Sequence, residues 1–110
     1  MATFVKGDIV VLPFPFSDLS ASKRRPALVL ANLQGDDIVL CQITSKSTRD
    51  SYAVALDNGD LVNGSLSVSS NIRPNRLFTA DKKIIAYIMG RVSQDKYKEV
   101  VNAITDLIQL

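Results

Sequence analysis

The sequence contains no histidine, no tryptophan and only one cysteine, Cys41, among its 110 residues. Histidine is the usual general base of enzymes and the commonest metal ligand. Without it, and with a single thiol, a zinc hydrolase, a Ser-His-Asp hydrolase and a Cys-His nucleophile are excluded. No carboxylates cluster at metal-ligand spacing either, so we expect no metal site and no cofactor. Any catalysis must use Arg, Lys, Thr, Ser, Tyr or carboxylate side chains.

Long hydrophobic runs are also missing. Each unbroken apolar stretch, such as Ala27–Ala31, is far shorter than the ~20 residues that a membrane-spanning helix needs. The first residues, Met1–Asp8, show neither the apolar core nor the cleavage site of a secretion signal. A single cysteine can form no internal disulfide, which suits a reducing compartment. We therefore expect a cytoplasmic protein without a membrane span.

What the sequence does contain is typical of one globular domain, residues 1–110. Hydrophobic residues make up 46% of it and charged residues 22%, and a chain of this length buries roughly 65% of its unfolded surface. Runs of apolar and β-branched residues predict six short strands. Proline donates no ladder hydrogen bond, so Pro13 should end the first strand and Pro74 should stop or kink the fifth. The expected strands cover residues 7–12, 25–32, 37–44, 52–57, 67–73 and 84–89, with turns or loops between them, including residues 58–60 and 63–64.

The last segment changes its hydrophobic period. Apolar residues from Tyr97 to Ile108 recur at the spacing of an amphipathic helix. Ser93 is placed to cap its first turn, and Asp95 suits the positive end of the helix dipole. Several short strands followed by one helix predict a mainly β fold: a small β-barrel of about six strands closed by a C-terminal α-helix.

The basic residues are unevenly spread, although the formal net charge is only +2. Three segments, residues 19–35, 38–49 and 61–80, contain no acid and together hold seven of the 13 Lys and Arg residues. If the fold brings these segments together, they produce a positive field that attracts phosphate. The alternative is a mixed, solvated surface.

Two polar groups of residues stand at the ends of apolar strands. Lys23-Arg24-Arg25-Pro26 lies at the entry to one strand, and Gln42-Ile43-Thr44-Ser45-Lys46 lies at the exit of the next. If the two strands form a hairpin, Arg25 and Thr44 are neighbours at one rim of the barrel. A guanidinium and a hydroxyl converging there could hold a phosphate. An ordinary surface arginine and a strand threonine are the alternative.

In order and spacing, five motifs together resemble the PemK/MazF family of toxins from toxin–antitoxin systems. The resemblance runs over essentially the whole chain. It implies an SH3-like β-barrel with a C-terminal helix, and metal-independent, sequence-selective cleavage of single-stranded RNA by a homodimer that a small antitoxin silences. The motifs are Lys6–Val10, Lys23–Leu30, Gln42–Lys46, Leu77–Thr79 and Gly90–Ser93.

The resemblance also implies roles for particular residues. The family's catalytic arginine, just before a proline, matches Arg25, and its catalytic threonine matches Thr44. A family pattern of Arg-x-acid falls on Arg73-Pro74-Asn75, which keeps the charge but not the acid. An amide cannot take a proton as a base, and the histidine that some members carry near the first loop is absent. Asp18 is then either the base or a solvated loop carboxylate.

The expected activity is attack by the RNA's own 2′-hydroxyl, leaving a 2′,3′-cyclic phosphate and a 5′-hydroxyl. The expected partners are single-stranded RNA, a second copy of the chain, and an antitoxin whose acidic or amphipathic segment fills the same groove near Phe14 and Phe16. The alternatives are a non-catalytic toxin of the same fold that inhibits a protein such as gyrase, and a passive nucleic-acid-binding barrel. The residues expected to bind RNA are Lys23, Arg24, Gln42, Ser45, Lys46, Arg73 and Asn75.

Overall fold

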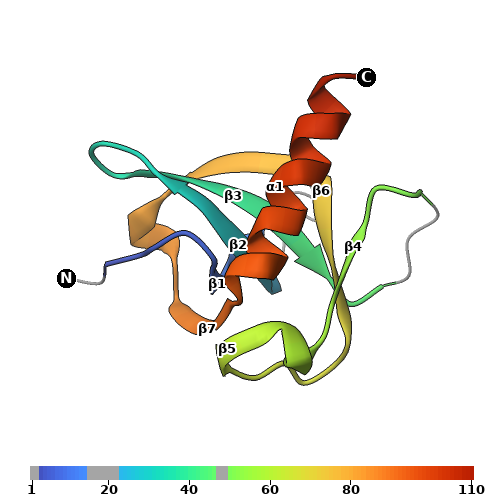
Figure 1. Ribbon diagram of the computed structural model, residues 1–110. Helices are drawn as coiled ribbons and strands as arrows, with labels where there is room; N and C mark the ends of the chain where they lie inside the picture. Colours follow the sequence, from blue (N-terminus) through green and yellow to red (C-terminus); the bar gives the residue numbers. More distant parts are fainter. Residues whose placement is uncertain (1–2, 15–22, 47–49) are drawn as a thin grey trace.

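The computed structural model describes residues 3–14, 23–46 and 50–110 (Figure 1). The described part is mainly β, with one α-helix at its C-terminal end and two short 3₁₀ turns, η1 (Asn58–Asp60) and η2 (Lys82–Ile84). Within it, no helix is long and apolar enough to cross a membrane. The remaining elements are β1 (Asp8–Phe14), β2 (Lys23–Asn32), β3 (Asp37–Thr44), β4 (Val54–Leu56), β5 (Leu61–Gly64), β6 (Ser70–Asp81), β7 (Tyr87–Val92) and α1 (Gln94–Ile108).

The strands form a single antiparallel sheet in the order β4-β6-β3-β2-β1-β7-β5. The sheet curls into a half-barrel, and α1 lies against β6 and β4 (Figure 1). The expectation of a mainly β fold with one C-terminal helix is confirmed. The described sheet has seven strands rather than about six.

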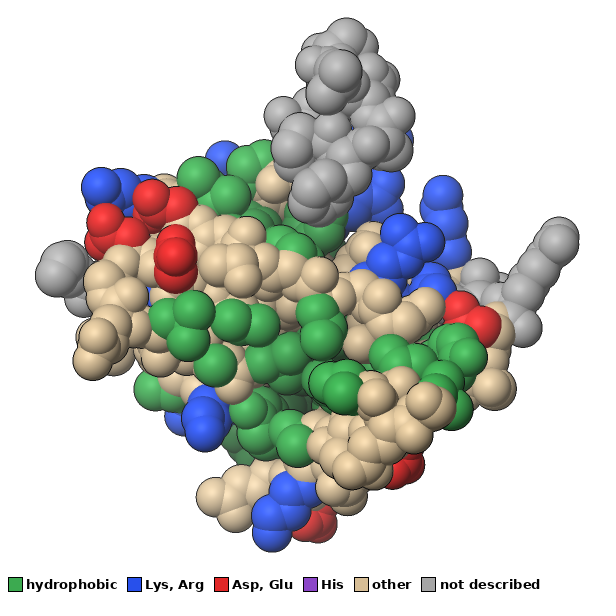
Figure 2. Space-filling model, turned by 90° about the horizontal axis from the view of Figure 1, so that it is seen from above, with side chains coloured by type: hydrophobic (Ala, Val, Ile, Leu, Met, Phe, Trp, Pro, Cys, Tyr) green, Lys and Arg blue, Asp and Glu red, His purple; other side chains and the backbone are tan. Residues whose placement is uncertain are grey.

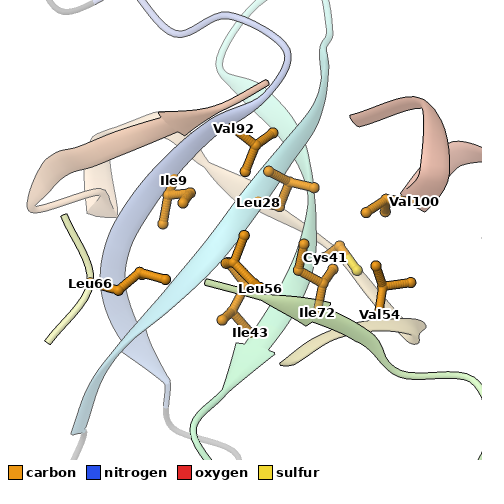
Figure 3. Packing of buried hydrophobic residues seen from close by; sticks show 10 residues of the cluster. All are labelled: Ile9, Leu28, Cys41, Ile43, Val54, Leu56, Leu66, Ile72, Val92 and Val100. Carbon is orange, nitrogen blue, oxygen red and sulfur yellow. The ribbon is translucent and has the colours of Figure 1, made fainter. Parts of the chain in front are cut away.

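Both faces of the central strands are buried. Leu28 packs into a core between the sheet and α1, whereas its neighbours Ala27 and Val29 pack into a second core on the other face. Figure 3 shows the first core, in which Val100 of α1 points toward the sheet. The ten buried residues of this core are Ile9, Leu28, Cys41, Ile43, Val54, Leu56, Leu66, Ile72, Val92 and Val100.

The helix starts as expected, and side chains hold its first turn. The Ser93 hydroxyl accepts a hydrogen bond from the Lys96 amide at 3.1 Å, which confirms the predicted cap. The Tyr97 hydroxyl donates to the Leu30 carbonyl on β2 at 2.7 Å, and burial raises the pKa of Tyr97. The expected apolar stripe is only partly covered, because Ile108 at the far end of the helix is 73% exposed.

Two prolines lie inside strands, against expectation. Pro13 pairs with Arg24 and β1 continues to Phe14, so the expectation that Pro13 ends the strand is wrong. Proline is tolerated in an antiparallel ladder where its nitrogen would not have donated. Pro74 lies in the middle of β6, which runs on to Asp81 instead of stopping near residue 73.

A bulge explains how β6 passes Pro74. Cys41 pairs with Leu77, but two residues further along β3 Ile43 pairs with Ile72, so residues 73–76 of β6 face only Gln42. A bulge of this kind leaves backbone groups without ladder partners. The Cys41 thiol donates to one of them, the carbonyl of Arg73, at a sulfur–oxygen distance of 2.8 Å.

Strand β5 lies where the sequence suggested a loop. It pairs with β7, and Gly64 lies opposite Gly90 in the register. A Cβ atom at Gly64 would be 2.2 Å from the Met89 carbonyl oxygen, and Gly64 has φ +78°. Only glycine permits this approach of the two backbones. Three other boundaries differ from expectation: β4 is shorter, the strand expected at 67–73 begins at Ser70, and the strand expected at 84–89 is β7 at 87–92, preceded by η2.

Candidate functional site

The ends of β1, β2 and β3 and the middle of β6 enclose a hollow of about 500 Å³. Four residues expected at the site, Arg25, Gln42, Thr44 and Lys46, lie in its lining. None of its described lining residues is acidic. The full lining is Phe14, Arg25, Gln42, Thr44, Lys46, Arg76, Leu77 and Phe78.

Arg25 and Thr44 are neighbours, as the hairpin predicted. The β2–β3 ladder pairs Ala27 with Gln42, Arg25 and Thr44 are each two residues along the chain from that pair, and both line the same hollow. Arg25 is half-buried and also pairs with Leu12 of β1, so strands flank it on both sides. Within the described residues it has no hydrogen-bond or ion-pair partner, which leaves its guanidinium available for an anion.

The Thr44 side chain is oriented by the backbone that follows it. Its Oγ1 accepts a hydrogen bond from the Lys46 amide at 3.2 Å, and the residue is only 9% exposed. Because a hydroxyl both accepts and donates, the hydroxyl hydrogen can still be donated. Arg25 and Thr44 therefore both present donors to the hollow.

Two aromatic rings form an apolar wall of the hollow. Phe14 and Phe78 meet edge to face, with ring centroids 5.1 Å apart and an interplanar angle of 74°. Leu77 lies beside them in the lining. Figure 2 shows Lys and Arg side chains gathered at the upper right of the face seen from above, next to a wide band of hydrophobic side chains. Cations beside an apolar wall suit a ligand with both a phosphate and a flat ring.

A second hollow of about 230 Å³ adjoins the first, and Arg25 and Thr44 line both. Arg24 and Ser45, also expected at the site, line this second hollow. The pair therefore stands at the border between an aromatic, cationic hollow and one rich in hydroxyl groups. The remaining lining residues of the second hollow are Pro26, Ile43, Leu66, Ser67, Val68, Ser70 and Met89.

Three residues expected at the site line neither hollow. The Arg73 guanidinium is paired with the Asp50 carboxylate at 2.6 Å, with 16% of the Arg73 side chain exposed. Asn75, in the bulge, and Lys23, at the start of β2, are both exposed. Asp18 and Phe16 lie outside the described residues.

Sequence reasoning missed Arg76, which does line the first hollow. Its only signal was its place in the third acid-free segment. Cys41 is no candidate nucleophile, because burial raises the pKa of its thiol to about 12. Among the described residues, no group of three or more His, Cys, Asp or Glu side chains could hold a metal ion.

Comparison with known proteins identifies the fold and the family. Residues 5–108 match the family described as PemK-like, MazF-like toxin of type II toxin–antitoxin systems. The chain belongs to this family. No curated protein sequence matches it.

Solved structures resemble the toxin over nearly its whole length. A MazE–MazF crystal structure (form III) from Deinococcus radiodurans is 22% identical with a TM-score of 0.78, covering 99% of each chain. An endoribonuclease in complex with its cognate antitoxin, from a mycobacterial species, is 15% identical with a TM-score of 0.76, covering 100% of this chain and 97% of that one. The Mycobacterium tuberculosis toxin MazF-mt6 is 16% identical with a TM-score of 0.72, covering 94% and 97%. At these identities the likeness establishes a shared fold.

Proposed function

We propose that this toxin is an endoribonuclease that cleaves single-stranded RNA, the mRNA of the cytoplasm, sequence-selectively and without a metal ion. The proposal depends on the placement of Arg25 and Thr44 at the border of two hollows. Their described lining includes four cations, Arg24, Arg25, Lys46 and Arg76, and no carboxylate. An RNA strand that crosses from one hollow to the other would place a phosphate against Arg25 and Thr44. Membership of the toxin family supports the same activity.

The reaction needs stabilisation of a negatively charged phosphorus centre. The 2′-hydroxyl loses its proton as its oxygen bonds to the adjacent phosphorus, and the 5′-oxygen takes up a proton as its bond to phosphorus breaks. The products are a 2′,3′-cyclic phosphate and a 5′-hydroxyl. Arg25 donates two parallel N–H groups to the non-bridging oxygens, on which charge builds up. Thr44, with its Oγ1 held by the Lys46 amide, donates its hydroxyl hydrogen to the same phosphate or orients the 2′-hydroxyl. Asn75 cannot take a proton, so the base is not assigned to it; Asp18, outside the described residues, is either the base or a solvated loop carboxylate.

The two hollows suggest how the strand is held. Lys46, Arg76 and Arg24 would contact flanking phosphates, and half-buried Gln42 would meet a base edge in the larger hollow, with Ser45 in the smaller. The Phe14–Phe78 wall would take the flat face of a base. Lys23, which is exposed at the start of β2, would contact only an RNA that extends beyond the two hollows. A duplex is excluded because pairing hides the base edges.

The antitoxin and the second copy are proposed on the same basis. The related D. radiodurans protein was crystallised with MazE, and a related mycobacterial endoribonuclease with its cognate antitoxin. An acidic, amphipathic segment would place carboxylates on the cations and apolar side chains on the wall near Phe14, and would displace RNA. Exposed hydrophobic residues on and before β7, including Ile84, Tyr87 and Ile88, would be covered in a homodimer.

The test is incubation of the toxin with a long single-stranded RNA in excess EDTA, followed by mapping of the cut ends. Cleavage with 2′,3′-cyclic phosphate ends is expected, and a 2′-deoxy substitution at the cut nucleotide should abolish it. Activity restored only by Mg²⁺ or Mn²⁺ would overturn the mechanism. Binding of RNA without cleavage would favour a passive nucleic-acid-binding barrel, and neither binding nor cleavage would favour a protein target.

A further inference from the structure

The ion pair between Arg73 and Asp50 joins β6 to the segment that leads from β3 to β4. We propose that Arg73 is a positioning residue, and that with Asp50 and Asn71 it forms a clasp that holds Thr44 and Lys46 in place for cleavage. This inference rests on the proposed endoribonuclease activity. It gives Arg73 a different task from the phosphate contact that the sequence suggested.

Both ends of the ion pair are held by other groups. The Arg73 carbonyl accepts the Cys41 thiol hydrogen bond at 2.8 Å, which ties its backbone to β3 across the bulge. The Asp50 carboxylate uses Oδ2 for the Arg73 guanidinium at 2.6 Å and Oδ1 for the Tyr52 amide at 3.1 Å. A short, charge-assisted bond between two anchored groups is a rigid link rather than a fluctuating surface pair.

The clasp has a second contact, closer to the site. The Asn71 side-chain amide donates to the Lys46 carbonyl at 3.3 Å, and Asn71 pairs with Thr44 in the β3–β6 ladder. The Lys46 amide in turn donates to Thr44 Oγ1 at 3.2 Å. Strand β6 therefore holds the chain on both sides of residues 47–49, at Lys46 and at Asp50. The Thr44 hydroxyl is oriented by a backbone that β6 fixes.

Several observations argue against a phosphate on Arg73. Its guanidinium faces a carboxylate, which a phosphate would have to displace. The Arg73 Nε atom is buried and has no hydrogen-bond partner among the described residues, so an RNA strand in the hollow would not reach this atom. Arg73 lines neither hollow, whereas Arg25 lines both and Arg76 lines the larger. Arg25 and Arg76 thus line the hollows, whereas Arg73, which is paired with Asp50, does not.

The experiment compares Arg73→Gln, Asp50→Asn and the double variant in cleavage of one RNA at several salt concentrations. Each single variant is expected to lower kcat on the order of 10- to 100-fold, because displacing a reacting group by ~1 Å costs about that much. The double variant should be no slower than the worse single variant, since both remove one clasp. KM and its salt dependence should change less than kcat, because Lys46 keeps its charge and Arg73 contacts no phosphate. Arg76→Gln is the matched control: it removes a phosphate contact and should reduce the salt slope of binding by about one.

Two results would overturn the clasp. One is an Asp50→Asn variant that cleaves at the wild-type rate while Arg73→Gln does not. The other is an Arg73→Gln variant whose salt slope falls as it does in Arg76→Gln. A second readout needs no cleavage: amide exchange of Lys46 and Tyr52 should speed up in Asp50→Asn, with an unchanged urea midpoint of the whole domain. Unchanged exchange at both amides would also refute the clasp. A wild-type protein that cleaves no RNA, with faster exchange in the variant, would instead refute the proposed function alone.

Discussion

Replacing Gly64 with alanine should be the most damaging of three glycine substitutions. The added Cβ would be 2.2 Å from the Met89 carbonyl oxygen and 2.5 Å from the Gly90 Cα, and both are backbone atoms that cannot rotate away. Gly64 also has φ +78°, which costs an L-residue about 1–2 kcal/mol. Overpacking adds roughly 1–3 kcal/mol. We therefore expect the free energy of unfolding to fall by about 2–5 kcal/mol.

Two other glycines separate the two contributions. Gly35 has φ +74° but open space around a built Cβ, so Gly35→Ala should lose only the backbone cost of about 1–2 kcal/mol. Gly59 has neither a positive φ nor a close neighbour, and Gly59→Ala should be neutral or stabilise by up to about 1 kcal/mol.

Urea denaturation at one pH gives the three free energies. A Gly64→Ala variant as stable as Gly35→Ala would refute the close approach of β5 to β7. A local readout should agree: amide exchange in residues 61–64 should rise in Gly64→Ala and not in the other two.

Three further predictions concern the site and its surroundings. Arg25→Ala should slow cleavage by on the order of 100-fold or more, with little recovery in Arg25→Lys, because an ammonium cannot reproduce the planar guanidinium fork. Measured cleavage rates check this, with Arg24→Ala as the control, in which KM should change more than kcat. Thr44→Val should abolish most of the rate while lowering the free energy of unfolding by only about 1 kcal/mol, the cost of the lost bond from the Lys46 amide; wild-type cleavage would remove Thr44 from the site. The folded-state pKa of Cys41, about 12, exceeds its ordinary value of 9.0, so between those values only the unfolded chain loses the thiol proton, and the free energy of unfolding falls as pH rises toward 12. Between pH 9 and pH 10 the free energy of unfolding of the wild type should fall by about 1 kcal/mol more than that of Cys41→Val, and equal falls would contradict the burial of this thiol.

The hairpin that carries the site was predictable because its signals are local. The apolar runs of β2 and β3 and the glycine turn at Gly35 are enough to bring Arg25 near Thr44, and both line one hollow. The helix was equally visible, since its cap at Ser93 and its apolar period lie within a few turns of chain.

The parts that the sequence did not reveal depend on distant partners. Residues 63–64 look like a loop because an Asn-Gly pair is typical of turns, and their pairing with Arg91 and Gly90 of β7 makes them part of a strand. Pro74 predicted a stop or a kink, and the sequence did not decide between them because the bulge that accommodates Pro74 is set by the register with β3. The same bulge placed Arg76 in the hollow and left Arg73 facing Asp50, an acid 23 residues away in sequence.

The bulge in β6 also separates what the strand must keep from what it can change. Residues 70–72 and 77–81 are held to particular partners by the ladder, so a substitution there acts on the whole sheet. Residues 73–76 face a single residue of β3, and Cys41 bonds to the backbone of Arg73 rather than to its side chain. A strand interrupted in this way can carry different side chains at the edge of the hollow while its register stays the same. Of these four residues, Arg76 lines the larger hollow, whereas Arg73 is paired with Asp50. Under the proposed function, exchange of the side chain at position 76 is thus a route by which the preferred RNA sequence can change without rebuilding the barrel.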